Sequence, residues 1–383
     1  MTAHAPHDPA PTGHAGPPEP VRIDPVLLDL LARVVEVEAS DLHLRSDAVP
    51  RVRRAGALEA LPVPALDAVT LSALLRTTMT PEVAASFARD LEADFAVAAP
   101  GIGRFRVNAF RSRGTDAAVL RRIGDRPVPL ADLAMPDAVG RLAMRPRGLV
   151  LVTGPTGSGK STTLSAMVDA VNAARAVHVL TLEDPIEVVH TDQRATVTQR
   201  ELGSDTRDWG AALRAAMRQD PDVILIGELR DADTVRAALS AAETGHAVLS
   251  SMHTTDVRET VLRLVDFFPA HEQPRVRAAL AACLEGVVCQ RLVPRADGDG
   301  RVCVVEVGVR DARFAEAVAD PDRTHEIPEI VAEGGWSGMQ TFDQHLLALV
   351  QAGTVDVRTA TMAASNPHDF GVMLRRTGWT AAP

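Results

Sequence analysis

Residues 154–161 read GPTGSGKS and fit the phosphate-loop pattern G-x-x-x-x-G-K-[ST] at every fixed position. The stretch follows the apolar run GLVLV at 148–152 and precedes a segment with helical character that starts at Lys160. Small residues are needed here because backbone N–H groups must turn inward around a phosphate, which side chains at Gly157 or Gly159 would obstruct. The sequence therefore predicts a nucleoside triphosphate site between a strand and a helix.

Each part of the loop has an expected contact with the nucleotide. Lys160 would neutralise the β- and γ-phosphates, Ser161 would bind Mg²⁺, and the following helix would present its positive end. ATP and Mg²⁺ are thus the predicted cofactors. The residues predicted to bind them are Gly154, Pro155, Thr156, Gly157, Ser158, Gly159, Lys160, Ser161 and Thr162.

From residue 148 onward, apolar strands alternate with helices. This order predicts an α/β domain with a parallel sheet that helices cover on both faces. Strands are expected at 148–153, 177–182, 223–227, 247–252 and 302–309, and helices at 160–173, 205–218, 231–244 and 257–267, before a helical C-terminal part.

The residues before 148 indicate a smaller α+β domain. Their periodicity predicts helices at 26–35, 66–78 and 81–91, strands at 41–45, 94–98, 104–111 and 117–123, and a strand pair over 52–61 that turns at Ala55-Gly56. The resulting domain boundaries are a disordered tail at 1–20, an N-terminal domain at 21–125, a linker at 126–147, an ATPase-type domain at 148–365 and a C-terminal tail at 366–383.

The composition of the chain disfavours some classes of function. Lys and Arg total 40 and Asp and Glu total 50, so the net charge of −10 disfavours a protein that binds nucleic acid phosphates. The chain has no Tyr and only 3% aromatic residues, so base-stacking platforms are scarce as well. No apolar run approaches the roughly 18 residues that span a bilayer, and no signal peptide is recognisable. We expect a cytoplasmic protein without a nucleic acid partner.

Hydrolysis requires an acid that orients and deprotonates water in line with the γ-phosphate. The run DVILIGE at 222–228 is an apolar strand that delivers Glu228 to the carboxyl edge of the sheet, where ligands of open α/β sheets bind. Glu228 is therefore the predicted general base. The alternative is a structural ion pair with Arg230. Gly227 stands where the usual magnesium-side Asp would be, so another acid must serve that role.

That acid is expected in the segment LEDPIE at 182–187, which ends the preceding predicted strand. Three acids within five residues repel one another unless a cation lies among them. We therefore place Glu183 and Glu187 in the Mg²⁺ and water network, with Glu187 also assigned to catalysis. The alternative is an acidic, solvated loop.

Two histidines flank the predicted strand 247–252. A histidine at the carboxyl edge of a sheet can donate to a γ-phosphate oxygen and respond to its loss. His253 and His246 are both predicted to act in this way. Each could instead be a structural histidine.

The N-terminal domain carries a concentration of arginines around the strand RFRVNAFR at 104–111. Arg104 and Arg111 are predicted to act as arginine fingers, which stabilise charge on a transferred phosphoryl group. A solvated strand face is the alternative.

Taken together, these segments resemble the type II/IV secretion ATPases, and within them the PilT-like pilus retraction motors. The resemblance also includes SDLHL at 40–44, GRFRVNAF at 103–110 and GMQTFD at 338–343. It implies a PAS-like N-terminal domain, a RecA-like ATPase domain and a homo-hexamer with nucleotide between domains. Its implied partners are the type IV pilus machinery and an inner-membrane platform protein, with the ring peripherally associated with that membrane.

The function implied is an ATP-hydrolysing motor for pilus retraction and twitching motility. The chain shows neither the extra N-terminal domain nor the four-cysteine zinc insert of assembly and secretion ATPases, which favours retraction. However, residues 311–318 read DARFAEAV where retraction motors carry an AIRNLIRE-like helix. A pilus assembly or type II secretion ATPase is therefore the alternative, and a non-hydrolysing ATP-binding regulator is a further one.

Overall fold

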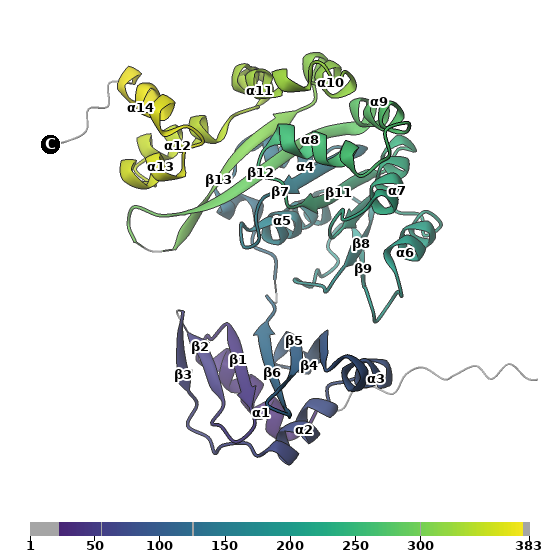
Figure 1. Cartoon of the computed structure of the whole chain (residues 1–383), viewed down its shortest axis with the longest axis vertical. Coiled ribbons are helices and arrows are strands. Elements are labelled where there is room, and N and C mark those ends of the chain that lie inside the picture. Colours follow the sequence, from purple (N-terminus) through teal and green to yellow (C-terminus); the bar gives the residue numbers. More distant parts are fainter. Residues whose placement is uncertain (1–22, 55, 125, 299, 378–383) are drawn as a thin grey trace, which may run out of the picture. The chain divides into compact units, whose positions relative to one another are not determined.

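The computed structural model describes residues 23–54, 56–124, 126–298 and 300–377 (Figure 1). The predicted disordered tail at 1–20 lies outside the described residues. The chain divides into two compact units between Ile123 and Gly124. Among the described residues, no helix combines the length and the apolar character that crossing a membrane would require.

The first unit contains a six-stranded antiparallel sheet with the strand order β3-β2-β1-β6-β5-β4. Phe105, Val107 and Ala109 alternate along β5 and are fully buried, so they form the inward face of this strand. The elements are α1 (Pro25–Glu36), β1 (Asp41–Arg45), β2 (Arg51–Arg54), β3 (Ala57–Ala60), α2 (Ala68–Arg76), α3 (Pro81–Asp90), β4 (Glu92–Ala99), β5 (Gly103–Ser112) and β6 (Thr115–Arg122).

The second unit is built on a seven-stranded sheet with the order β13-β12-β7-β11-β10-β8-β9, in which only β13 is antiparallel to its neighbour. Its strands are β7 (Gly148–Thr153), β8 (His178–Glu183), β9 (Thr196–Glu201), β10 (Val223–Ile226), β11 (Ala247–Met252), β12 (Leu284–Pro294) and β13 (Arg301–Val309). The helices that accompany them are η1 (Leu130–Leu133), α4 (Asp137–Ala143), α5 (Lys160–Ala174), α6 (Trp209–Ala216), α7 (Ala232–Glu243), α8 (Val257–Asp266) and α9 (Gln273–Cys283).

Helices cover both faces of this sheet. Every residue of β7, β10 and β11 is buried, and successive side chains of a strand point to opposite faces. The predicted α/β architecture is therefore confirmed.

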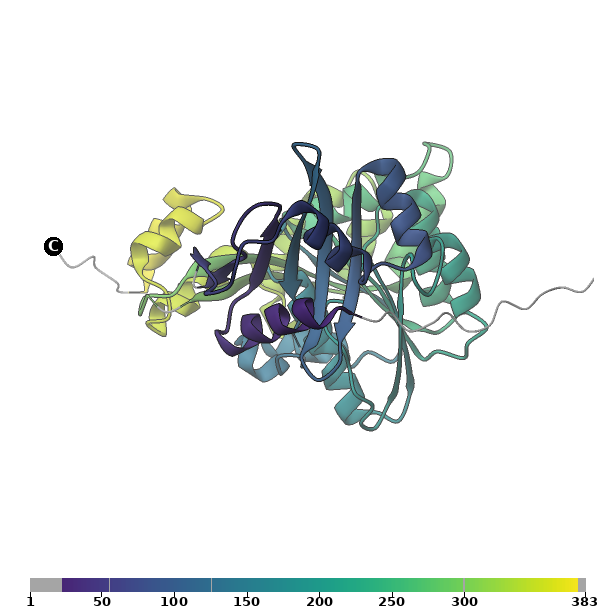
Figure 2. The ribbon, with the colours of Figure 1, turned by 90° about the horizontal axis from the view of Figure 1, so that it is seen from below.

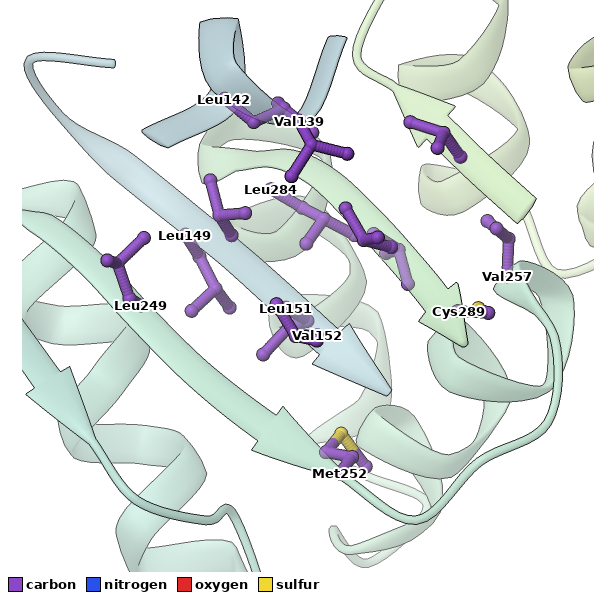
Figure 3. Packing of buried hydrophobic residues seen from close by; sticks show 14 of the residues in the cluster. Val139, Leu142, Leu149, Leu151, Val152, Leu249, Met252, Val257, Leu284 and Cys289 are labelled. Atoms are coloured by element: carbon purple, nitrogen blue, oxygen red, sulfur yellow. The ribbon is translucent and has the colours of Figure 1, made fainter. Parts of the chain in front are cut away.

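Helix α4 belongs to the core of the second unit, although its residues fall within the predicted linker 126–147. Val139 and Leu142 are buried, and Figure 3 shows them beside residues of β7 and β12 such as Leu149 and Leu284. Although the segment is rich in Pro, its short helix has an apolar face that packs on the sheet.

The C-terminal helices gather beside the β12–β13 hairpin (Figure 1 and Figure 2). They are α10 (Ala312–Ala319), η2 (Thr324–Glu326), α11 (Ile327–Glu333), η3 (Gly334–Ser337), α12 (Phe342–Gln351), α13 (Val357–Ala363) and α14 (Pro367–Arg376). Between η3 and α12, Gln340 exchanges two backbone hydrogen bonds with Val307 of β13, with N···O distances of 2.8 and 3.1 Å. The predicted tail boundary at 365 is too early, because Phe370 and Leu374 of α14 are buried in the core.

Helix α8 begins where Val257 N–H donates to Glu306 Oε1 of β13 at 2.8 Å. Burial raises the pKa of this Glu306 carboxyl from its ordinary value of 4.5 to about 7. Asp256 and Asp343 raise this pKa further, while Arg291 lowers it. Between these two pH values the folded state holds a proton that the unfolded state has lost, so this group makes the fold less stable as the pH rises through the window.

The Glu306→Gln variant should therefore become progressively more stable than the parent protein between pH 5 and pH 8. The glutamine keeps an oxygen that accepts from Val257 N–H but carries no charge. The difference in the free energy of unfolding between the two proteins should grow by about 2 to 3 kcal/mol over this range. Urea denaturation of both proteins at several pH values measures it, and a constant difference would contradict the expectation.

Candidate nucleotide site

The register of the parallel strands brings four segments to one edge of the second sheet. Thr153 at the end of β7 pairs with Met252 at the end of β11, and Ile226 of β10 pairs with Ser250 of β11 and Leu182 of β8. The loop 154–159, His253, Glu228 and the acidic segment 183–187 follow these strand ends. The structure therefore places them at the same carboxyl edge, which is where open α/β sheets bind ligands.

The conformation of the loop depends on glycine at its first position. Gly154 has φ +142°, and a Cβ atom there would lie 2.5 Å from the Gln290 carbonyl oxygen of β12 and 2.6 Å from Ser158 Oγ. Gly157, with φ +80°, has no atom within 4 Å of the position a Cβ would take. Glycine at residue 154 therefore allows the backbone to turn from β7 into the loop close to β12. The space beside Gly157 is open.

Lys160 joins the loop to the neighbouring strand end. Its Nζ donates to the carbonyl oxygens of Gly154 at 2.8 Å and Pro155 at 3.2 Å, and lies 3.4 Å from Nδ1 of His253. Burial lowers the pKa of Lys160, and the carboxylates of Glu228 and Glu187 partly offset this effect.

His253 connects Lys160 to Glu228. Its Nε2 lies 3.4 Å from Glu228 Oε1, on the side of the ring opposite the lysine. Because a lysine ammonium can only donate, Nδ1 must accept from Lys160, and the proton of a neutral ring is then on Nε2, facing the carboxylate. Arg230 Nε donates to the other carboxylate oxygen of Glu228 at 2.9 Å. The Arg230 ion pair considered from the sequence is therefore present, alongside the contact with His253.

Gly227 packs closely against the end of the neighbouring strand β8. Its N–H donates to the Leu182 carbonyl oxygen at 2.8 Å. A Cβ atom at Gly227 would lie 3.3 Å from that same oxygen and 3.4 Å from the Trp209 ring. The structure thus explains why glycine occurs where the sequence pattern would place an aspartate.

The Gly227→Asp variant should accordingly be destabilised, because its carboxylate would have to fit beside a carbonyl oxygen and an aromatic ring. We expect the free energy of unfolding to fall by about 1 to 3 kcal/mol. Urea denaturation at pH 7 measures this change, and stability equal to that of the parent protein would contradict the packing argument.

Glu183 and Glu187, the two acids predicted to lie in the Mg²⁺ and water network, differ in their surroundings. Glu183, at the end of β8, is half-buried, and its Oε1 accepts from Thr181 Oγ1 at 2.6 Å and from Gln199 Nε2 at 3.0 Å. Burial raises the pKa of the Glu183 carboxyl, while these two hydrogen bonds lower it. Glu187 is exposed. In this segment, Glu183 is thus fixed by hydrogen bonds, whereas Glu187 is exposed to solvent.

The residues predicted to hold Mg²⁺ carry oxygen atoms, which are the ligands that this ion prefers. Within the described residues, no group of three or more His, Cys, Asp or Glu side chains could hold a metal by itself. A nucleotide-bound Mg²⁺ needs no such group, because phosphate oxygens and waters supply most of its ligands. Ser161 is exposed in the first turn of α5, and Glu183 at the end of β8 and Glu187 after it lie at the same sheet edge as the loop. Ser161, Glu183 and Glu187 therefore stay the candidates.

His246 does not join this group. It precedes β11, and its backbone oxygen accepts from Gly148 N–H, at the start of β7. Its Nδ1 lies 3.0 Å from the Ala241 carbonyl oxygen and 3.2 Å from Thr244 Oγ1. The six residues of β11 separate it from the loop edge by roughly 20 Å at about 3.3 Å per residue. Within one chain, the predicted γ-phosphate contact of His246 does not agree with this position.

Comparison with known proteins identifies the family. The family model described as "Type II/IV secretion system protein" matches residues 20–334. The chain belongs to this family. It is 41% identical to the type IV pilus retraction ATPase PilT of Pseudomonas aeruginosa over 344 residues, which cover 90% of this chain and 99% of that protein. It is also 40% identical to a twitching motility protein of Neisseria gonorrhoeae over 321 residues, covering 84% and 86% of the two chains.

A solved structure of the pilus retraction motor PilT with bound ADP has a fold similar to that of this chain. The TM-score is 0.82 at 38% identity, covering 90% of this chain and 98% of that one. The resemblance to PilT-like ATPases predicted from the sequence is thereby confirmed, as are the RecA-like fold and the ATPase activity. The alternative of a regulator that does not hydrolyse ATP is set aside.

The two predicted arginine fingers of this secretion ATPase lie on β5, in the first compact unit. Arg104 is half-buried, and Arg111 forms an ion pair with the buried Asp116 at 3.1 Å. Their role at a nucleotide stays a prediction.

Sequence reasoning missed two amides of the secretion ATPase that contact the site. Gln290 of β12 donates to Thr163 Oγ1 of α5 at 2.8 Å, and its carbonyl oxygen faces Gly154. Gln199 of β9 donates to Glu183. Neither strand was predicted. The mostly apolar stretch LEGVVCQRLV at 284–293 was the available signal for β12, whereas β9, with the sequence TVTQRE, is largely polar and gives only a weak one.

Proposed function

We propose that this chain is the ATP-driven motor of type IV pilus retraction, the process behind twitching motility. The observation that carries the proposal is its similarity to PilT over 90% of this chain and 99% of that relative. The loop, Glu228, His253 and the acidic segment, gathered at one sheet edge, supply the chemistry that such a motor needs.

In the proposed reaction, Lys160 leaves the loop carbonyls and binds the β- and γ-phosphates. Glu228 orients the attacking water and takes its proton, and His253 keeps the Glu228 side chain in place. When bound, Mg²⁺ would neutralise charge on the phosphates, held by Ser161 with Glu183 and Glu187 in its surroundings. After the γ-phosphate leaves, the contacts of Lys160 and His253 change together because these side chains touch.

The proposed assembly is a homo-hexamer with nucleotide between domains. Arg104 and Arg111 would complete the site from an N-terminal domain by stabilising charge on the transferred phosphoryl group. ATP binding would close the two domains, and hydrolysis would reopen them. Successive closures around the ring would move an inner-membrane platform protein of the pilus machinery, which places the ring at the cytoplasmic face of that membrane.

The second candidate function is pilus assembly or type II secretion by an ATPase of the same family. It is favoured by residues 311–318, DARFAEAV, which differ from the AIRNLIRE-like helix of retraction motors. The structure forms a helix here, α10, with Phe314 and Val318 buried.

Deleting the gene from its host separates the two functions. Hyperpiliated, non-motile cells are expected, and the parent gene should restore motility. A Glu228→Gln copy should not restore it, although the protein is still made. Cells without surface pili would instead indicate an assembly motor.

A further inference from the structure

One face of β9 holds the acidic segment that follows β8. The two strands are parallel, with Thr181 opposite Gln199 and Glu183 opposite Glu201. Residues two apart on a strand share a face, so these four side chains lie together. Glu183 has already been placed among the Mg²⁺ candidates, whereas Gln199 and Glu201 have no role so far.

The amide of Gln199 makes three hydrogen bonds to this segment. Its Nε2 donates to Glu183 Oε1 at 3.0 Å and to the Val188 carbonyl oxygen at 2.9 Å, while its Oε1 accepts from His190 N–H at 2.8 Å. A single side chain therefore fixes both ends of the segment 183–190. Glu201 holds the middle, because its Oε2 accepts from Ile186 N–H at 3.1 Å.

We propose that Gln199 is a positioning residue for ATP hydrolysis, which holds the Glu183 carboxylate in the geometry that the reaction needs, while its bonds to Val188 and His190 fix the amide itself in place. The inference rests on the proposed role of Glu183 near Mg²⁺ and its waters. Gln199 acts through Glu183 and does not itself contact the nucleotide.

The chemistry of the site requires an amide at residue 199. A carboxylate there could accept from His190 N–H but could not donate to Glu183 or Val188, and it would add a like charge beside Glu183. A leucine would fill similar space without any hydrogen bond. Since Glu201 still holds Ile186, loss of Gln199 should displace the ends of the segment without unfolding it.

A double-mutant cycle tests the proposal. Gln199→Leu should lower kcat for ATP hydrolysis about 10- to 100-fold, as displaced catalytic groups do. The Kd for ADP should stay within about twofold of the parent value, because the variant leaves the loop contacts intact. The Gln199→Leu and Glu183→Gln double variant should be no slower than Glu183→Gln alone, since the first residue acts through the second.

Gln193→Leu is the matched control. This exposed glutamine donates to Asp169 Oδ1 at 3.0 Å, away from the acidic segment, so kcat should be unchanged. Amide hydrogen exchange of residues 184–190 gives a readout independent of activity: it should become faster in Gln199→Leu but not in Gln193→Leu. If Gln199→Leu does not fold, Gln199→Glu serves in its place, with the same loss of kcat expected.

Three results would overturn the proposal. The kcat of Gln199→Leu could stay within about twofold of the parent, the losses in the double variant could multiply, or Glu183→Gln alone could turn over normally. Each of these leaves the proposed motor function standing if Glu228→Gln is inactive. Conversely, an active Glu228→Gln protein would overturn the proposed mechanism without deciding the role of Gln199.

Discussion

Glu228→Gln should lower kcat for ATP hydrolysis about 10²- to 10⁴-fold, because the amide can no longer take a proton from the attacking water. Nucleotide binding should persist, since the contacts of the loop do not involve residue 228. A coupled phosphate-release assay measures turnover, and the change in fluorescence of a labelled ADP on binding measures affinity.

The matched control for this variant is Glu329→Gln on α11, which makes the same chemical change at an exposed residue. It should turn over at the parent rate. If Glu228→Gln also kept the parent rate, the base would have to be another acid, with Glu187 the next candidate at this sheet edge.

Gly154→Ala should destabilise the protein by about 2 to 5 kcal/mol. The alanine would adopt a backbone conformation reserved for glycine, and its Cβ would overlap the Gln290 carbonyl oxygen and Ser158 Oγ. Because Gln290 is fixed in β12 and Ser158 belongs to the loop itself, the loop would have to move, so nucleotide affinity should fall as well. Urea denaturation without nucleotide isolates the stability effect.

Gly157→Ala provides the comparison within the same loop. Its φ of +80° is also unfavourable for alanine, but nothing lies within 4 Å of the added carbon. We expect a loss of about 1 to 2 kcal/mol. Equal losses in both variants would show that backbone conformation alone, and not the contact with Gln290, governs the loop.

Much of the second unit could be predicted from the sequence, because its central strands are uninterrupted apolar runs. The segments that form β7, β10 and β11 are buried on both faces and are therefore apolar throughout. They can be recognised as strands without knowing which strands they pair with. The loop pattern and the acid after β10 followed from the same strands. Their positions at one edge depend only on the strands being parallel.

The remaining features depend on contacts that a single chain segment does not reveal. His246 and His253 are close in sequence, yet a strand carries them to opposite edges of the sheet. Gln199 lies in a strand, TVTQRE, that is largely polar and therefore lacks the apolar alternation by which strands are recognised. Its importance comes from three partners on another strand and its loop, and no local pattern predicts those bonds.

The backbone pairing of Gln340 with Val307 also affects how readily the protein aggregates. Strand β13 lies at the edge of the sheet, and an unpaired edge is a template for joining with strands of other molecules, which leads to aggregation. The segment around Gln340 covers part of that edge. Shortened versions that end before Gly338 would expose this edge, together with the core residues that α12 and α14 cover, and should precipitate more readily than the full chain.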